Sequence, residues 1–301
     1  MLPFRKPYRR FSLLIFALAF ASLAEANAQS KVLEGLSFAS RSTNHTINYA
    51  LYLPSDYEWS NRSYPVLYLF HGLGNNENAW IQFGNMKSSM DALYSSASIA
   101  PMIVVMPDAG NSWFIDDIKS AYPFESIFMN EFINHIDSEY NTRPERKFRA
   151  LGGLSMGAYG ALILSFRNSD KVSAVFSLSP AIWTDESIQS LSRDQYLGTF
   201  SEIYTDDPSH RLTDHWDAHA VLNQARLKSS SDLSKVSYYI TSGDDDPGIT
   251  TATAELHIIL RNKGVPHEYR VYDGGHTWNY WRKTFPEAVK FISDEFQRGV
   301  E

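Results

Sequence analysis

No cysteine occurs among the 301 residues of the chain. Its absence excludes disulfide bonds, a thiolate nucleophile, cysteine-ligated metal sites and acylation of a lipoprotein cysteine. The fold must then be stabilised by its hydrophobic core, and 44% of the residues are hydrophobic. Internal repeats and low-complexity linkers are also missing. The length therefore predicts one large domain with at most a modest insertion.

Positive charge is scarce, with 27 Lys and Arg residues against 34 Asp and Glu residues and a formal net charge of −7. Four of the basic residues lie within the first ten positions. The rest of the chain is therefore still more acidic. Such a chain is poorly suited to nucleic acids or to anionic membrane surfaces, so we expect neither as a partner.

The hydrophobic run Phe11–Ala24 is too short to span a bilayer comfortably, which takes roughly 20 residues. A cationic stretch precedes it, and Ala26-Asn27-Ala28 follows as an A-x-A cleavage site. We predict that residues 1–28 are a signal peptide cut after Ala28, with an uncleaved anchor as the alternative. The mature chain, with 23 basic and 33 acidic residues, would carry −10 and be secreted or periplasmic, without stable membrane insertion.

Strand-like and helix-like segments alternate through the rest of the chain. Short apolar runs predict strands buried on both faces, and apolar residues at helical spacing predict the helices between them. This alternation predicts an α/β fold, a mostly parallel central sheet flanked by helices, in a single domain over residues 29–301. The predicted strands are His45–Leu53 (an edge strand or half of a hairpin), Val66–Phe70, Met102–Met106, Phe148–Leu151, Ala174–Leu178, Val236–Ile240 and Glu268–Val271, and the predicted helices are Ile127–Tyr140, Tyr159–Phe166, Ala252–Lys263 and Phe285–Phe296.

Residues 181–234 interrupt this alternation. The segment is polar, and its pattern predicts irregular structure with scattered aromatic residues. We expect this excursion to run over the strand ends as a short partial lid. A surface insertion with no role in substrate binding is the alternative interpretation.

The motif Gly153-Leu154-Ser155-Met156-Gly157 has the form G-x-S-x-G, with an apolar run before it and a helical pattern after it. Strand, sharp turn and helix in that order are typical of a nucleophile elbow, which exposes the serine hydroxyl. A turn in which Ser155 merely caps the helix is the alternative. A catalytic serine also needs a base, which an acid orients.

The best candidate for the base is His276, in the glycine-bordered loop Gly274-Gly275-His276-Thr277-Trp278 between a predicted strand and the last predicted helix. The acid should follow a strand between Ser155 and His276. Three candidates, Asp244, Asp245 and Asp246, follow the strand Val236–Ile240, and we favour Asp246. Adjacent carboxylates lack the alternation of a calcium loop, so we predict no metal site.

Stabilising an oxyanion requires two N–H donors. The residue after the nucleophile, Met156, supplies one, and the second should come from the loop after an early strand. The sequence there is Phe70-His71-Gly72-Leu73-Gly74, and we expect the Leu73 N–H to be this donor. A simple tight turn at His71-Gly72 is the alternative.

These motifs together resemble the esterase D-type branch of the α/β-hydrolase superfamily. That branch includes feruloyl and acetyl-xylan esterases, tributyrin esterases, S-formylglutathione hydrolases and mycolyltransferases. The resemblance runs from about residue 50 to residue 296. Its matching pieces are His71-Gly72-Leu73-Gly74, Met106-Pro107-Asp108, Gly153-Leu154-Ser155-Met156-Gly157, Ser177-Leu178-Ser179-Pro180, Gly243-x-x-Asp246 and Gly275-His276-Thr277-Trp278.

The resemblance implies an α/β-hydrolase fold, a Ser155–Asp246–His276 triad, and Leu73 and Met156 as oxyanion donors. It implies serine esterase activity through an acyl-enzyme, with no metal or organic cofactor. The branch often has a second glycine after its motif, where this chain has Ala158-Tyr159. We expect that departure to narrow the cleft.

The expected substrate is a small-molecule or polysaccharide-linked ester, with a feruloyl, acetyl or other short acyl group. Acyl transfer on the same triad, thioester hydrolysis of the S-formylglutathione type, and a binding protein on a hydrolase scaffold are the alternatives. Asn111 is expected to add a polar contact at the mouth of the site. The predicted substrate-binding residues are Trp80, Asp108, Trp113, Tyr159, Trp183 and Trp278.

Overall fold

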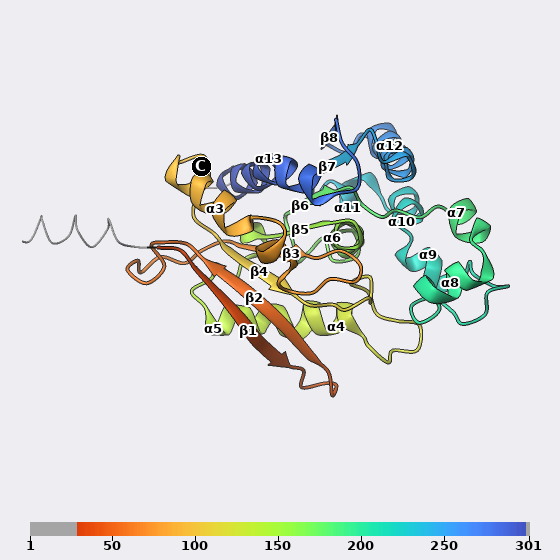
Figure 1. Ribbon diagram of the computed structural model, residues 1–301, viewed down its shortest axis with the longest axis horizontal. Helices are drawn as coiled ribbons and strands as arrows, with labels where there is room; N and C mark the ends of the chain where they lie inside the picture. The colour runs from red at the N-terminus through yellow and green to blue at the C-terminus, as the bar shows by residue number, and fades with distance from the viewer. Residues whose placement is uncertain (1–28, 299–301) are drawn as a thin grey trace, which may run out of the picture.

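An eight-stranded sheet runs through the centre of the protein, for which a computed structural model describes residues 29–298 (Figure 1). The predicted signal peptide lies outside the described residues. The strand order is β1-β2-β4-β3-β5-β6-β7-β8; β1 pairs antiparallel with β2 and β2 with β4, and all other neighbours are parallel. The strands are β1 (Lys31–Ala39), β2 (Thr46–Leu53), β3 (Val66–Phe70), β4 (Ile103–Pro107), β5 (Arg149–Leu154), β6 (Ala174–Leu178), β7 (Ser237–Gly243) and β8 (His267–Tyr272).

All seven predicted strands are present, with ends within three residues of those predicted. The sequence analysis missed β1, which forms a hairpin with β2. The pairing of β1 shifts register between Leu33 and Leu36, and Gly35 between them has φ 70°. A bulge of this kind breaks the period of two by which a strand is recognised in a sequence.

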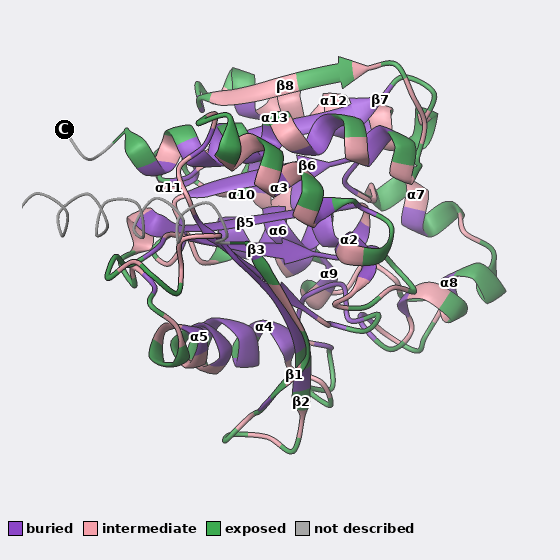
Figure 2. Ribbon diagram, turned by 60° about the vertical axis from the view of Figure 1, so that its left-hand side comes forward, coloured by how far each residue is buried: buried purple, intermediate pink, exposed green. Residues whose placement is uncertain are grey.

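Helices cover both faces of the sheet, and Figure 2 shows buried residues concentrated in the strands and on the inner helix sides. On one face, alternate side chains of β3 (Val66, Tyr68, Phe70) pack in a core with α6 (Met156–Arg167) and α12 (Pro247–Asn262). On the other face, Leu67 and Leu69 pack in a second core with α3 (Met86–Ser95) and α13 (Trp278–Gln297), while the short α2 (Ala79–Gln82) contributes Trp80. Burial on both faces explains the continuous apolar runs of the central strands.

The predicted helix Ile127–Tyr140 is the later part of a longer, irregular helix. It consists of α4 (Phe124–Ile127), a π-helical turn at Phe128–Phe132 and α5 (Ile133–Glu139). Phe124, Phe128 and Phe132 stack in series along it, with ring centroids 5.7 and 5.8 Å apart. A π turn holds one residue more than the α-helical pattern, so it changes which side chains share a face.

The excursion is helical rather than irregular, and this prediction was wrong. Ser or Thr side chains cap the N-termini of four of its helices, so its polar residues start helices instead of preventing them. Its aromatic residues Tyr196, Phe200, Tyr204 and Trp216 are buried. The helices are α7 (Asp185–Ser190), α8 (Arg193–Phe200), α9 (Asp214–His219), α10 (Val221–Leu227) and α11 (Ser230–Leu233).

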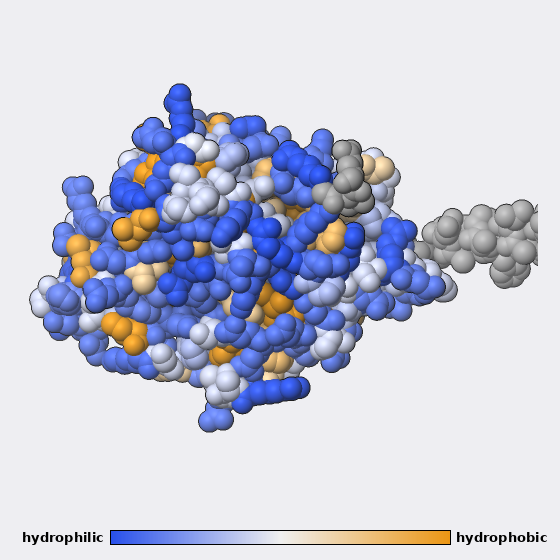
Figure 3. All heavy atoms as spheres, turned by 180° about the vertical axis from the view of Figure 1, so that it is seen from behind, coloured by the Kyte–Doolittle hydropathy of each residue, from blue (hydrophilic) through white to orange (hydrophobic). Residues whose placement is uncertain are grey.

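The surface is largely hydrophilic on the face shown in Figure 3, where hydrophobic side chains form small separate patches. Among residues 29–298, none of the helices combines the length and apolar character needed to cross a bilayer. The large exposed hydrophobic side chains come from separate parts of the chain: Trp59, Leu73, Phe83, Ile118, Leu227, Ile258 and Val271.

Candidate active site

Ser155 occupies the sharp turn between β5 and α6, with φ 53° and ψ −118°. A left-handed φ is unfavourable for serine, so the packing around the turn must hold it. A Cβ at Gly153 would lie 2.6 Å from the carbonyl carbon of Gly157, and one at Gly157 would lie 2.5 Å from the carbonyl oxygen of His71. Both glycines are therefore required by close backbone packing, as the elbow motif predicts.

Three side chains from distant loops form one hydrogen-bonded chain. His276 Nε2 lies 2.8 Å from Ser155 Oγ, and His276 Nδ1 lies 2.6 Å from Asp246 Oδ2. Since a carboxylate can only accept, the ring proton belongs on Nδ1, which leaves Nε2 free to accept from the serine hydroxyl. The His276 side chain is 36% exposed and that of Asp246 is 12% exposed. A half-buried serine thus contacts a base that an almost buried carboxylate orients.

The position of Asp246 separates it from the other two acidic candidates. Asp246 directly precedes α12 and contacts His276, whereas Asp244 accepts a hydrogen bond from the Gly274 N–H at 3.0 Å. Asp245 is exposed, and its carboxylate gathers with those of Asp244 and Asp273 at the surface. Asp244 therefore holds the loop that carries His276, and Asp246 orients the ring itself.

Trp281 is a residue of the site that the sequence analysis missed. Its ring packs edge-on against His276, with centroids 5.0 Å apart, and its Nε1–H donates to Ser179 Oγ at 3.2 Å. Trp281 thus supports the imidazole from the side of α13. It was not recognisable because the contact depends on how the loop folds back onto the helix, which no local motif encodes.

The loop after β3 approaches Ser155 closely, since a Cβ at Gly72 would lie 3.7 Å from Ser155 Cβ. Buried His71 accepts a hydrogen bond from the Ala109 N–H through Nε2 at 3.1 Å, and its Nδ1–H donates to the Gly72 carbonyl at 2.8 Å. That carbonyl belongs to the same peptide group as the Leu73 N–H. Leu73 is 46% exposed at this loop, and Met156 begins α6.

Three of the predicted substrate-binding residues are core residues instead, and these predictions were wrong. The Trp80 indole packs against Trp278 and donates to the Phe70 carbonyl at 2.9 Å. Trp113 packs edge-on against Tyr159. These large rings belong to the hydrophobic cores on the two faces of the sheet. The sequence alone could not tell whether such a ring lies in a core or lines a cleft.

Tyr159 does not narrow the cleft as expected. Its side chain is buried, and its hydroxyl bonds the Tyr204 hydroxyl at 2.8 Å and donates to the His219 carbonyl at 2.8 Å. Tyr204 and His219 both belong to the excursion. Tyr159, at the position of the family's second glycine, therefore links α6, the helix that follows Ser155, to the excursion.

The remaining predicted contact residues lie nearer the surface. Trp183 and Trp278 are half-buried, and Trp278 packs against exposed Phe83 with centroids 5.8 Å apart. Asp108 accepts from the Gly110 N–H at 2.8 Å; burial alone would raise its pKa, but its hydrogen bonds hold it below the ordinary value. Asn111 Oδ1 accepts from the Gly74 N–H at 2.9 Å.

Two cavities lie on opposite sides of the serine along the edge of the sheet. An apolar cavity of about 440 Å³ is lined by the segments that follow β6 and β7, with Trp183, Ile249 and Asp246 among the lining residues. A polar cavity of about 450 Å³ lies between the loop after β4 and the excursion. In the sheet, β5 stands between β3 and β6, so Ser155 at its end separates the two cavities.

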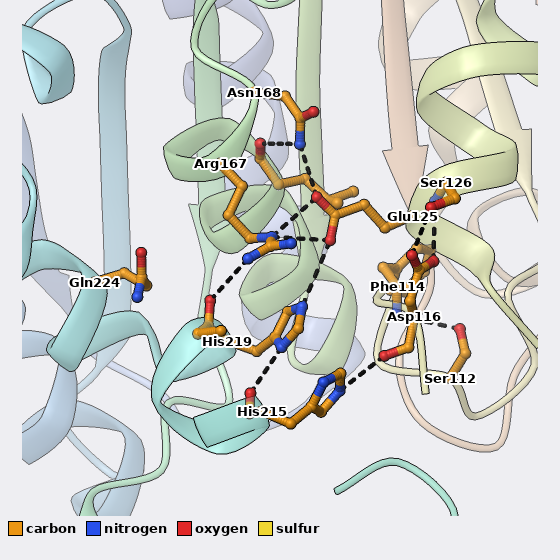
Figure 4. Close-up of polar contacts among 12 residues, drawn as sticks. Ser112, Phe114, Asp116, Glu125, Ser126, Arg167, Asn168, His215, His219 and Gln224 are labelled. Atoms are coloured by element: carbon orange, nitrogen blue, oxygen red, sulfur yellow. Dashed lines mark hydrogen bonds and ion pairs between the residues drawn. The ribbon is translucent and has the colours of Figure 1, made fainter. Parts of the chain in front are cut away.

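A buried polar cluster, drawn in Figure 4, fixes the excursion to the body of the protein. Glu125 of α4 accepts from Arg167 Nε at 2.9 Å and from Asn168 Nδ2 at 2.9 Å, and its Oε2 lies 3.6 Å from His219 Nε2. Burial would raise the pKa of Glu125, but these contacts lower it below the ordinary value. His215, on the same helix as His219, donates to the Asp116 carbonyl at 2.9 Å.

Comparisons with known proteins show the family to which the chain belongs. Residues 40–292 match the family model described as "Putative esterase". An acetyl esterase of Caldicellulosiruptor saccharolyticus is 26% identical over 76% of this chain and 83% of its own length. An endo-1,4-beta-xylanase/feruloyl esterase of Xylanibacter ruminicola is 31% identical over 55% of this chain, and the match spans only 24% of that longer protein.

Solved structures give the same fold. A ferulic acid esterase superposes with a TM-score of 0.76 at 29% identity, covering 90% of this chain and all of the other. An S-formylglutathione hydrolase from Staphylococcus aureus superposes with a TM-score of 0.70 at 15% identity, covering 88% of this chain and 99% of the other. The resemblance seen in the sequence is thereby confirmed. The chain belongs to this esterase family, has the α/β-hydrolase fold, and is a carboxylic ester hydrolase.

Proposed function

We propose that the protein is a serine esterase whose nucleophile is Ser155, with His276 as general base and Asp246 as the orienting acid. The observation that carries this proposal is the chain of two short contacts, 2.8 Å from hydroxyl to imidazole and 2.6 Å from imidazole to carboxylate. These are hydrogen-bond distances at which proton transfer is direct. The family membership supports ester hydrolysis, and the geometry supports the assignment of roles.

In the proposed reaction, Ser155 Oγ attacks the ester carbonyl carbon while His276 Nε2 takes its proton. The N–H groups of Leu73 and Met156 stabilise the oxyanion, and Asp246 stabilises the imidazolium. His276 then protonates the leaving alcohol, and the carbon–oxygen ester bond breaks to leave an acyl-enzyme. Water, deprotonated by His276, attacks that intermediate and releases the acid and Ser155.

A fluorophosphonate probe tests the nucleophile directly. We expect the folded protein to be labelled at Ser155 and the Ser155→Ala variant to remain unlabelled, with its ester hydrolysis lowered about 10⁶-fold in kcat. Labelling of another serine in the wild-type protein would contradict the assignment. A circular dichroism spectrum matching that of the wild type shows that the variant is folded.

The substrate proposed is an ester of a short or aromatic acid, attached to a small alcohol or a polysaccharide. The names of the relatives support acetyl and feruloyl groups, and the apolar cavity beside Trp183 could hold either. Rates on p-nitrophenyl esters of rising chain length, methyl ferulate, acetylated xylan and S-formylglutathione would rank these groups. A clear preference for the thioester would replace this proposal with the thioesterase alternative.

Hydrolysis is preferred to acyl transfer because the catalytic imidazole is reached by solvent, with 36% of the His276 side chain exposed. A transferase must keep water away from the acyl-enzyme. Adding a sugar acceptor to the assay and separating the products distinguishes the two. If transfer product outweighs free acid, the hydrolase proposal fails.

We also propose, from the sequence of residues 1–28, that the enzyme is exported to the periplasm or the medium and cleaved after Ala28. N-terminal sequencing of protein recovered from cell fractions tests this. A mature N-terminus at Gln29 outside the cytoplasm would support it, and an intact N-terminus in the cytoplasm would contradict it.

A further inference from the structure

The segment that follows β6, residues 178–181, lies against the backbone of the proposed nucleophile. The Ser155 N–H donates to the Leu178 carbonyl at 3.0 Å, and the Ser155 carbonyl accepts from the Ala181 N–H at 3.1 Å. Both backbone polar groups of Ser155 are thus bonded to one short stretch of chain at the end of the neighbouring strand. These bonds help to hold the left-handed conformation of the nucleophile elbow.

Ser179, inside this segment, has a strained backbone of its own. Its φ is 48°, in the left-handed region that is unfavourable for serine, and the residue is fully buried. Its N–H donates to the Thr241 carbonyl of β7 at 2.7 Å, which helps to hold this conformation. Backbone strain concentrates at functional sites, so the Ser179 hydroxyl is a candidate for a role beyond packing.

The hydroxyl of Ser179 holds the indole ring of Trp281. The Trp281 Nε1–H donates to Ser179 Oγ at 3.2 Å, and both residues are buried. An indole nitrogen can only donate, so this bond fixes which edge of the ring faces Ser179. The same ring contacts His276, with the ring centroids 5.0 Å apart and the ring planes at 86°. The indole therefore connects a strained, buried serine to the proposed catalytic base.

The imidazole of His276 needs a support of this kind. Its two ring nitrogens are bonded to Ser155 and Asp246, but these bonds leave the ring free to tilt about the line that joins the nitrogens. The side chain is 36% exposed, and the two residues before it are glycines, which offer no side chain to limit the tilt. The edge-on packing of Trp281 limits it instead. Proton transfer depends on such alignment, because a small misplacement of a catalytic group costs a large factor in rate.

We propose that Ser179 is a positioning residue, which sets the orientation of His276 by fixing the indole of Trp281. The inference rests on the proposed function, because it takes Ser155 as the nucleophile and His276 as the base. The segment 178–181 then supports both partners of the proton transfer. Its backbone holds Ser155, and the hydroxyl of Ser179 holds the ring that packs against His276. Without that hydroxyl the buried indole N–H has lost its acceptor, and the ring is no longer held in one orientation.

The test removes the two ends of one hydrogen bond separately. Ser179→Ala removes the acceptor, and Trp281→Phe removes the donor but keeps an aromatic ring. We expect each variant to lower kcat on p-nitrophenyl acetate about tenfold at unchanged KM, because the base is misaligned while substrate binding is untouched. The double variant should lose no more than the larger of the two single losses, since both substitutions act through the same bond.

Ser177→Ala is the matched control. Ser177 is a buried serine of β6, two residues before Ser179, and its hydroxyl donates to the Ala158 carbonyl at 3.2 Å. This substitution also removes a buried hydroxyl, but one that contacts neither Trp281 nor His276. Its free energy of unfolding in urea should fall, while its kcat and KM should match those of the wild type.

The outcomes separate a positioning role from a structural one. Unchanged kcat in folded Ser179→Ala, single losses that add up in the double variant, or a rise in KM that accounts for the lower kcat/KM would each overturn the inference. If Ser179→Ala does not fold, Trp281→Phe decides alone, and an unchanged kcat in that variant overturns it. The proposed function is judged on the wild type, because labelling of Ser155 and hydrolysis of the ester uphold it whatever the variants do. Absence of both in the wild type overturns the proposed function itself.

Discussion

Two histidine–carboxylate pairs occupy very different surroundings in this molecule. His276 and Asp246 meet at 2.6 Å on the strand-end edge, with 36% and 12% of their side chains exposed. His219 and Glu125 lie 3.6 Å apart under the excursion, with 4% and 9% exposed. Both pairs join an imidazole to a carboxylate, but the remaining ring nitrogen of His276 faces a serine hydroxyl, whereas that of His219 faces a backbone carbonyl.

The comparison shows that a reactive pair differs from a structural one less in residue type than in two other features. These are its exposure to solvent and the presence of an atom that is free to take up a proton. His276 can gain a proton on Nε2 because solvent and a hydroxyl lie beside it. Glu125 is already occupied by Arg167 and Asn168, so its charge serves to fix the excursion to α4 and α6. Perturbed or paired titratable groups therefore indicate function only when an atom remains free to react.

The largest effect should follow from breaking the first pair. Replacing Asp246 by Asn removes the carboxylate that fixes the ring tautomer, and we expect kcat to fall about 10⁴-fold. Steady-state kinetics on p-nitrophenyl acetate measure it. Asp244→Asn is the matched control two residues away, and its loss should be far smaller, because Asp244 supports only the Gly274 backbone. Equal losses in both variants would contradict the assignment of the acid.

Breaking the second pair should affect stability instead of chemistry. Glu125→Gln leaves Arg167 and His219 without their carboxylate, and we expect the free energy of unfolding to fall by about 2 to 3 kcal/mol. That is less than is usual for a buried ion pair, because Arg167 is partly exposed. Urea unfolding measures the change. The control is Glu268→Gln, which removes the carboxylate of the exposed ion pair between Glu268 and Arg270. A large loss of kcat with unchanged stability would make the cluster part of the catalytic machinery.

The pH dependence of stability sharpens the same contrast. Burial, with a smaller contribution from the nearby His219, lowers the pKa of His215 to about 4, from an ordinary value of 6.5. The folded state therefore binds a proton less readily than the unfolded state, so stability is full above pH 6.5 and falls between pH 6.5 and 4.

The measurement is a series of urea titrations across that range for the wild type and for His215→Gln. The variant should show a shallower fall, whereas His210→Gln, at an exposed histidine of the same excursion, should follow the wild type. Identical slopes in all three proteins would show that His215 titrates alike in the folded and unfolded states.

The smallest effect is expected at Tyr159, the link between the two regions. Tyr159→Phe removes the hydroxyl that bonds Tyr204 and the His219 carbonyl, and we expect a loss of about 1 kcal/mol in stability. Its kcat/KM should stay within about threefold of the wild type, because the ring is buried away from both cavities. A tenfold loss of kcat/KM at unchanged Tm would contradict this prediction and would show that Tyr159 takes part in substrate binding.

The features that could be predicted from the sequence are those determined by residues close together in the chain. Val66–Phe70 and Ala174–Leu178 were located to the residue, because burial on both faces leaves a continuous apolar run. Ser155, His276 and Asp246 were identifiable because each lies on a loop whose glycines or chain order mark it, and the structure brings them into contact.

Large aromatic side chains were where sequence reasoning failed. A tryptophan in a core and one in a cleft have the same local neighbours in sequence, so Trp80 and Trp113 were misassigned and Trp281 was missed. The capped helices of the excursion were missed for a different reason. Each is only four to eight residues long, too short for an apolar periodicity to show.

The π turn at Phe128–Phe132 makes the anchoring of the excursion depend on the length of one helix. Deleting a single residue there would restore a regular α-helix, and every side chain before the deletion would rotate by about 100° relative to α5. Glu125 would then point away from Arg167 while the phenylalanine stack lost its alignment. A one-residue deletion in this turn would thus undo the attachment of the excursion that borders the catalytic edge, without altering any residue that forms that attachment.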